Sequence, residues 1–359
     1  MTGGAIDLSG DRVTLTTAVE VREAAKSALD AGATHYTDRP GIPELREAVA
    51  VKLAEANAVA VRPADEVLIT CGVQEALFLA MQVLAGVGDE VIVTGPALPA
   101  DIELVRMVGA AARVAPADDR LRLDVEQVSE LITDDTRLIL FRSPSAVGEV
   151  ITDSRLDRVA ALAIEHDLRV ISVESGEALT ATGVEHRSIA AVEGLAPRTV
   201  TINGFGGVGL DAWRVGYLAA QRELMGGMRR LKQELSICSP AVSQHAAITA
   251  IGRAAAYNAA LVDRLDVRRV ALELALMQSG LEHIAPRGGV FVFVKPDPAI
   301  SVPVAIARAA EVGVVVADGV RAGAAGWLRL TLDREPDLLH TAAYRLASVI
   351  GNIPAEAAV

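Results

Sequence analysis

The hydrophobic positions in the first two-thirds of the chain alternate between helical spacing and short apolar runs. Residues 19–31 have the spacing of an amphipathic helix, and so do residues 41–56, which open on a Gly-Ile-Pro turn. A third helical segment covers residues 74–84 and ends before Gly86. Apolar runs of strand length lie at residues 66–69, 91–94, 138–141, 169–173 and 199–202. Such runs, separated by helices and without strict alternation, predict a mostly parallel sheet covered on both faces.

The last third of the chain has a different pattern. A long helical stretch from residue 221 to about 274 leads away from the predicted sheet. Strands at 289–295 and 327–332 then accompany helices at 302–312 and 335–350. We therefore expect an α/β protein with three parts: an N-terminal segment that joins the small domain, a large domain and a small α+β domain, covering residues 1–40, 41–250 and 251–359.

Composition narrows the class of protein. Apolar residues make up 51% of the 359, which is enough for a sizeable core. Residues 76–87 are the most apolar stretch, and they are too short to span a bilayer and are interrupted by Gln82. The first residues lack a basic region followed by an apolar core, so we expect no signal peptide and a cytoplasmic location.

Charge and metal-binding residues exclude several partners. The net charge of −12 disfavours nucleic acid and anionic membranes. The two cysteines have no metal-ligand spacing, and no two of the six histidines stand at helical or ribbon spacing. We therefore predict no metal site.

Several segments, in this order along the chain, resemble the class I and II aminotransferases, the fold-type-I family that uses pyridoxal phosphate. They are residues 35–46, 70–76, 88–93 with the proline-bearing loop 96–99, 213–217 and 327–330. The resemblance covers nearly the whole chain. It implies a large domain with a mostly parallel, seven-stranded type of sheet between helices, a smaller α+β domain and a homodimer.

A glycine turn between a strand and a helix is the first candidate binding feature. Gly72, Val73 and Gln74 occupy this turn, where free backbone N–H groups and the positive end of the helix dipole favour a phosphate. An ordinary strand-to-helix connection would have the same pattern. The resemblance implies that these residues form a phosphate cup, that Arg214 also holds the phosphate, and that Tyr36 reaches it from the neighbouring subunit.

Arg329 is the second candidate. The resemblance implies that it pairs with the α-carboxylate of a substrate, a role that suits the planar fork of a guanidinium. A partly exposed ion pair on a strand is the alternative interpretation. The expected ligand is therefore a small anionic molecule.

The family's Schiff-base lysine has no counterpart in the matching loop. That lysine both forms the Schiff base and moves the Cα proton. Residues 203–209 appear one residue shorter than in the family, and the lysine position falls on Gly206 or Gly207. The four lysines, Lys26, Lys52, Lys232 and Lys295, lie elsewhere in the sequence, and we expect none at the carboxyl edge of the sheet.

Other positions that contact the pyridine ring in the family also differ here. The ring-nitrogen aspartate aligns with Val173, the tyrosine near the ring hydroxyl with Gly176, and the stacking aromatic residue with Leu98. The asparagine expected in loop 143–148 is absent. We predict that the pocket is lined by Leu98, Ser145, Val173, Gly176 and Asn203.

These substitutions predict a repurposed site. In this hypothesis the protein binds an anionic amino-acid-like or phosphorylated ligand, has no covalently bound pyridoxal phosphate, and runs no lysine-dependent transamination; a PLP-independent biosynthetic enzyme is one form of it. The catalytic residues are unknown, with Glu174, Asp211 and Tyr36 as candidates for acid–base chemistry. A capping or ion-paired carboxylate is the alternative for Glu174.

Two other hypotheses stay open at this point. The chain could be a noncatalytic subunit that pairs with an active aminotransferase and lends it Tyr36. It could also be a weak enzyme that holds pyridoxal phosphate, or the amine form of this cofactor, without a covalent bond.

Overall fold

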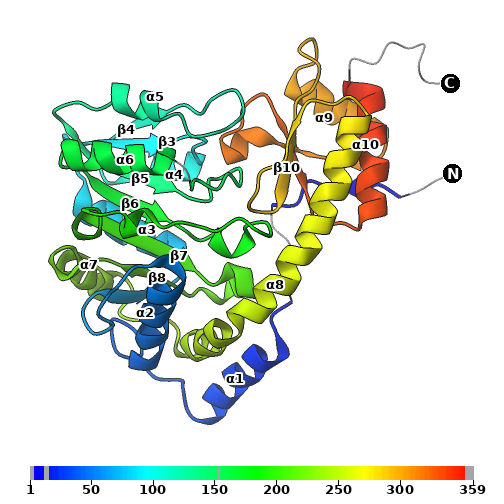
Figure 1. The fold of residues 1–359 in the computed structure, drawn as a ribbon. Helices are drawn as coiled ribbons and strands as arrows, with labels where there is room; N and C mark the ends of the chain where they lie inside the picture. Colours follow the sequence, from blue (N-terminus) through cyan, green and yellow to red (C-terminus); the bar gives the residue numbers. More distant parts are fainter. Residues whose placement is uncertain (1–3, 12–15, 153, 352–359) are drawn as a thin grey trace.

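A seven-stranded sheet forms the centre of the large domain in the computed structural model, which describes residues 4–11, 16–152 and 154–351 (Figure 1). In spatial order its strands are β2 (Val67–Thr70), β8 (Gly216–Ala219), β7 (Thr199–Gly204), β6 (Arg169–Val173), β5 (Thr136–Arg142), β3 (Glu90–Thr94) and β4 (Ala111–Ala115). Only β8 is antiparallel to its neighbours, β2 and β7. The other strands therefore share a direction, and their carboxyl ends lie at one edge of the sheet, where α/β proteins bind ligands.

Helices cover both faces of this sheet, which confirms the fold class predicted from the apolar runs. On one face the strands pack against α3 (Val73–Leu84), α4 (Pro99–Met107) and α7 (Arg222–Leu235). On the other they pack against α2 (Pro43–Asn57), α5 (Val125–Glu130), α6 (Ser154–Glu165) and the first part of α8 (Ala241–Gln278). Because both faces are buried, the central strands have no polar face and show no alternation.

The long helical stretch expected at 221–274 is two helices. α7 ends at Leu235, and α8 begins at Ala241 after Pro240, whose fixed φ and missing N–H suit the start of a helix and not its interior. α8 then runs from the large domain to the small one, and α1 (Val19–Asp30) packs along it (Figure 1).

The smaller domain is built on a four-stranded antiparallel sheet. Its order is β12 (Ala317–Asp318), β13 (Leu328–Thr331), β10 (Phe291–Val294) and β9 (His283–Ile284). A separate parallel pair joins β1 (Ile6–Asp7), near the start of the chain, to β11 (Val314–Val315). The end of α8, α9 (Val302–Glu311) and α10 (Pro336–Ile350) close the core of this domain. The domain boundaries given above stay a prediction.

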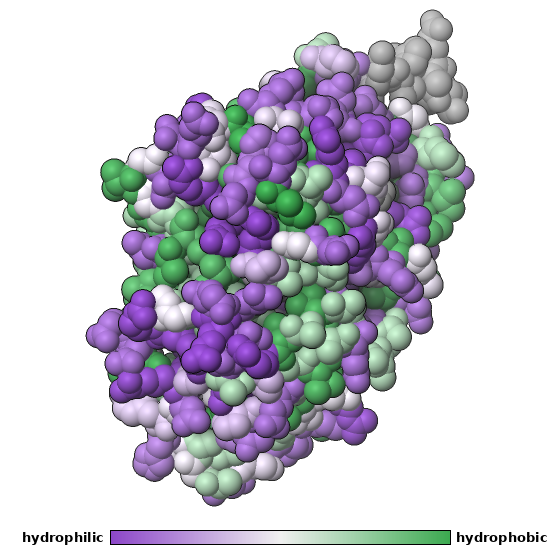
Figure 2. Space-filling model, turned by 60° about the vertical axis from the view of Figure 1, so that its left-hand side comes forward, coloured by the Kyte–Doolittle hydropathy of each residue, from purple (hydrophilic) through white to green (hydrophobic). Residues whose placement is uncertain are grey.

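The surface is mixed in character. Figure 2 shows one face on which hydrophilic residues predominate and hydrophobic residues form patches between them. Among the described residues, no helix is both long enough and apolar enough to cross a membrane.

Candidate functional site

The turn between β2 and α3 has the geometry of an anion cup. Gly72 is the N-cap of α3 with φ of 86°, and within the described part of the chain no side chain caps the first N–H groups of that helix. Two hydrogen bonds stabilise the turn. The Glu75 carboxylate accepts from the Cys71 N–H at 2.5 Å, and Lys232 donates to the same carboxylate at 3.1 Å. Free amides at the start of a 12-residue helix can therefore receive an anion.

Arg214 lies over this turn. Its Nη2 donates to the carbonyl oxygen of Cys71 at 2.6 Å, and a Cβ added to Gly72 would stand 3.0 Å from its Nη1. Gly72 thus leaves room for the guanidinium and also adopts a φ that favours glycine. Since Arg214 is exposed, its remaining N–H groups face solvent and can reach a ligand.

Replacing Arg214 by glutamine is expected to weaken binding of pyridoxal phosphate or inorganic phosphate about 10- to 100-fold, the size of one lost charge-assisted hydrogen bond. Isothermal titration calorimetry measures the change. Arg222→Gln is the control. The Arg222 side chain is 72% exposed, and its ion pair with Asp65 is long, at 3.8 Å. Equal affinities for the Arg214 and Arg222 variants would remove Arg214 from the cup.

Arg329 forms a second anion-binding candidate in the small domain. It lies on β13, is 7% exposed, and its guanidinium carbon is 4.5 Å from the centre of the Phe291 ring. Nη2 donates to the carbonyl oxygens of Ser9 and Gly10 at 3.2 and 3.4 Å. Its Nε is buried without a hydrogen-bond partner among the described residues.

In the loop after β7, an added side chain at Gly207 has no room, and one at Gly206 would require the Asp211 carboxylate to move. A Cβ on Gly206 would lie 2.6 Å from Oδ1 of Asp211, and a Cβ on Gly207 would lie 2.5 Å from Cβ of Ala178. Neither residue supplies an amine. These two positions therefore do not fit the Schiff base that the family resemblance implies, whereas the cup at Gly72 and Arg214 does fit a phosphate.

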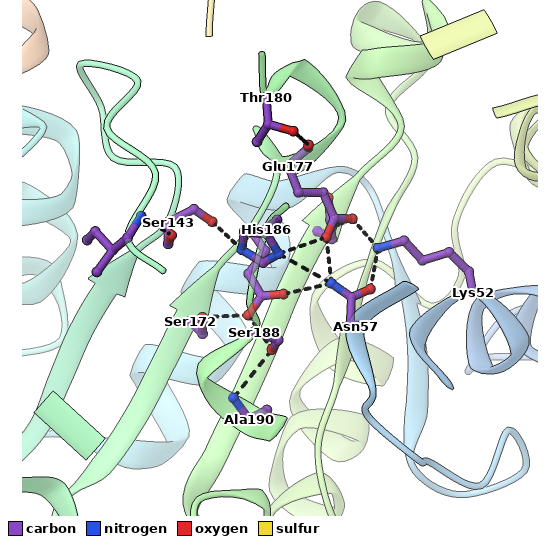
Figure 3. Close-up of polar contacts among 12 residues, drawn as sticks. Lys52, Asn57, Ser143, Ser172, Glu177, Thr180, His186, Ser188 and Ala190 are labelled. Carbon is purple, nitrogen blue, oxygen red and sulfur yellow. Dashed lines mark hydrogen bonds and ion pairs between the residues drawn. The ribbon is translucent and has the colours of Figure 1, made fainter. Parts of the chain in front are cut away.

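A buried polar network lies beside the carboxyl ends of β6 and β7 (Figure 3). Glu174, directly after β6, accepts hydrogen bonds from Ser172 at 2.8 Å and Ser188 at 2.7 Å. Glu177 forms an ion pair with Lys52 of α2 and accepts from Asn57 at 2.6 Å. The amine of Lys52 thus reaches this edge of the sheet, contrary to the expectation that no lysine does so.

Glu174, Glu177 and His186 also bring three potential metal-ligand atoms within 4.8 Å of one another. The amide nitrogen of Asn57 occupies the space among them, at 3.4 Å from Glu174, 2.6 Å from Glu177 and 3.5 Å from His186. The Lys52 ammonium already balances Glu177. Hydrogen-bond donors therefore already contact the oxygen atoms that a cation would need.

The two carboxylates of the network titrate in opposite directions. Burial raises the pKa of Glu174 above its usual value near 4.5, because water cannot solvate the charge. Burial acts on Glu177 in the same sense, but the charges of Lys52 and His186 outweigh it and lower the pKa of that carboxyl. Glu174 is closed off from solvent, which leaves it poorly placed for the acid–base role considered from the sequence.

Glu174→Gln is expected to gain stability relative to the parent protein as pH rises. A carboxyl with a raised folded-state pKa contributes stability below its unfolded pKa and loses it as pH rises through the folded value. Glutamine has no such loss. Urea unfolding between pH 4 and 8 measures the difference, with exposed Glu193→Gln as the control. A difference independent of pH would contradict the raised pKa.

The other residues singled out from the sequence lie at several places. Val173 is buried at the end of β6, and Asn203, the last residue but one of β7, donates to Glu177 at 2.6 Å. Leu98 is the N-cap of α4, and the Ser145 hydroxyl accepts from the Glu149 N–H at 3.2 Å. A Cβ on Gly176 would be 3.4 Å from Pro144, so that glycine lies against loop 143–148.

Tyr36 and Asp211 complete the set. Tyr36 is 81% exposed, so within one protomer its side chain faces solvent. Asp211 begins a short 3-10 turn, η5 (Asp211–Trp213), and its carboxylate lies beside Gly206. Their roles as site residues stay predictions.

Comparison with known proteins decides the family. The model of the class I and II aminotransferases matches residues 5–346. The chain belongs to the class I and II aminotransferase family. It is 30% identical to an aspartate aminotransferase of Pyrococcus abyssi and 33% identical to an aspartate/prephenate aminotransferase of Thermus thermophilus, each over 92% of this chain and 87% of the relative. The solved aromatic aminotransferase of Pyrococcus horikoshii superposes with a TM-score of 0.90 at 29% identity, over 96% of this chain and 95% of that one.

These likenesses contradict the prediction of a repurposed site, and with it the noncatalytic-subunit and weak-enzyme hypotheses. Relatives named as aspartate aminotransferases match over most of both chains, which indicates a conventional aminotransferase. The prediction gave the substitutions around one pocket more weight than a resemblance along the whole chain.

The cofactor prediction is corrected on the same finding. Membership in this family indicates a pyridoxal-phosphate enzyme, so the interpretation of Gly206 and Gly207 as loss of the Schiff base is overturned by the aminotransferases among its relatives. Residues 203–209 themselves contain no lysine and supply no amine.

Proposed function

We propose that this aminotransferase-family protein transfers an amino group between an amino acid and a 2-oxo acid, with aspartate and aromatic amino acids as the first candidate donors. The buried guanidinium of Arg329 is the observation that carries the proposal. The names of the relatives, which include aspartate, prephenate and aromatic substrates, support this choice of donors.

Arg329 is suited to hold the α-carboxylate that all these substrates share. A buried N–H without a partner costs stability, so the free Nε favours a ligand that accepts its hydrogen bond. The Ser9 and Gly10 carbonyls and the Phe291 ring fix the plane of the guanidinium. A carboxylate can then bind in a bidentate manner at a prepared site.

The cup at Gly72 and Arg214 is the proposed place of the cofactor phosphate. When bound, pyridoxal phosphate supplies the electron sink for the reaction. No catalytic step is assigned to Gly206 or Gly207. The proposal includes a homodimer, in which the exposed Tyr36 would reach the cup of the neighbouring subunit.

The test is a transamination assay on the purified protein with added pyridoxal phosphate. Aspartate, glutamate, phenylalanine and tyrosine serve as donors, 2-oxoglutarate and oxaloacetate as acceptors, and mass spectrometry detects the products. Turnover with at least one pair is expected. No pair above the protein-free control would overturn the proposal.

Borohydride reduction followed by peptide mapping identifies the amine. A reduced adduct on one of Lys26, Lys52, Lys232 or Lys295 is expected. Lys52 is a poor candidate: burial disfavours its ammonium, but Tyr217 and Glu177 outweigh that effect and raise its pKa. Turnover without any labelled lysine would show that the activity does not depend on a Schiff base between the cofactor and a lysine of this chain.

A further inference from the structure

A short 3-10 turn, η1 (Glu177–Leu179), is tied to two distant parts of the large domain (Figure 3). On one side, Glu177 accepts hydrogen bonds from Lys52 and Asn57 of α2. On the other side, it accepts from Asn203 of β7 at 2.6 Å. One carboxylate, on a side chain only 13% exposed, therefore joins a helix on the outside of the sheet to the strand that leads into loop 203–209.

The connection continues into the loop itself. Oδ1 of Asn203 accepts from the Gly204 N–H at 2.7 Å, so the same side chain that binds Glu177 also fixes the first peptide of the loop. The next residue of η1 adds a packing contact, because Ala178 lies so close to Gly207 that a Cβ there would be 2.5 Å away. The turn therefore holds the loop at two points.

The loop in turn lies against the phosphate cup. A Cβ on Gly204 would be 3.0 Å from Cγ2 of Val73, the first residue of α3. At its other end the loop leads through η5 to Arg214, which covers Gly72. A displacement of residues 203–209 would thus move the surface that a ligand in the cup contacts.

We infer that Glu177 is a positioning residue for the reaction. It fixes η1 between α2 and β7, and η1 fixes loop 203–209 against the cup. This inference rests on the proposed function. A misplacement of about 1 Å at a site can lower a rate by roughly 100-fold, so a residue outside the pocket can act through this loop.

The inference predicts a specific kinetic signature. Glu177→Gln keeps the shape of the side chain and removes its charge, which loosens the connection to Lys52 and Asn203. We expect kcat to fall by roughly 10- to 100-fold, while KM for the amino donor changes less than about threefold, because Arg329 lies in the other domain. Glu185→Gln, an exposed glutamate on the following segment, is the matched control.

A second variant tests the same loop without changing any charge. Ala178→Leu enlarges the side chain that touches Gly207 and should displace the loop, with the same fall in kcat. In a Trp327→Phe background, which removes the second tryptophan, Trp213 reports the displacement, since it stands between the loop and Arg214 and its Nε1 donates to Thr17 at 3.3 Å. A shift of its fluorescence emission is expected in both variants and not in Glu185→Gln.

Measuring the affinity for pyridoxal phosphate tests this inference independently of whether the protein catalyses transamination. If the parent protein shows no transamination, Glu177→Gln and Ala178→Leu should still weaken pyridoxal phosphate at the cup and shift the Trp213 emission. The inference is overturned if both variants match Glu185→Gln in kcat, in cofactor affinity and in emission. It is also overturned if thermal unfolding accounts for the whole loss of activity.

Discussion

Replacing Arg329 by lysine is expected to lower kcat/KM for the amino donor about 100-fold, because a point charge cannot replace the two N–H groups of the fork. The loss should fall mainly on KM if the carboxylate is held equally in the ground state and the transition state. Steady-state kinetics with the best donor of the panel measures it.

Arg321→Lys is the matched control. Arg321 is an exposed arginine, and it is close enough to Arg329 for its positive charge to lower the pKa of Arg329. Its kcat/KM should stay within about twofold of the parent value, as is usual for surface substitutions. Equal losses in both variants would point to a general effect of positive charge, and Arg329 would then not be the carboxylate site.

Replacing Lys52 by methionine is expected to lower the free energy of unfolding by about 3 kcal/mol, because the variant leaves the Glu177 carboxylate buried without its cation. Methionine keeps most of the length of the side chain and removes only the charge. Urea unfolding at pH 7 measures the loss. It should shrink in acid, since a carboxyl with a lowered folded-state pKa contributes stability above its unfolded pKa and loses it as pH falls.

Lys26→Met is the control for this prediction. Lys26 pairs with Glu23 at 2.7 Å, but their side chains are 67% and 57% exposed, so the variant should lose less than about 1 kcal/mol. A double variant, Lys52→Met with Glu177→Gln, should recover part of the loss, because it removes both buried charges. If Lys52→Met costs no more than Lys26→Met, the ion pair contributes little to stability.

The sequence also shows where pattern analysis fails. β4 was not predicted, because as the edge strand of the sheet it has mostly exposed residues, and Arg113 interrupts its small apolar residues. The functional prediction failed for another reason. Each substituted ring contact was a local observation, whereas the chain is similar to named aminotransferases over 92% of its length.

The polar network could not have been found from spacing. Lys52 and Glu177 are 125 positions apart, and neither belongs to a motif. The one available signal was the raised density of polar residues after β6, which a surface loop would also explain. Only the tertiary fold, which places the second half of α2 beside the turn after β6, brings these side chains into contact.

What the sequence determined by itself is the layered architecture and the glycine turn between β2 and α3. Burial of both sheet faces requires apolar runs of strand length, and the backbone conformation of the turn favours a glycine. Both are local requirements, so the sequence shows them at Gly72 and along the sheet. Tertiary structure alone decided that Gly207 has no space for a side chain, and that the Lys52 amine reaches the edge of the sheet. Both depend on contacts between distant segments, which no local pattern records.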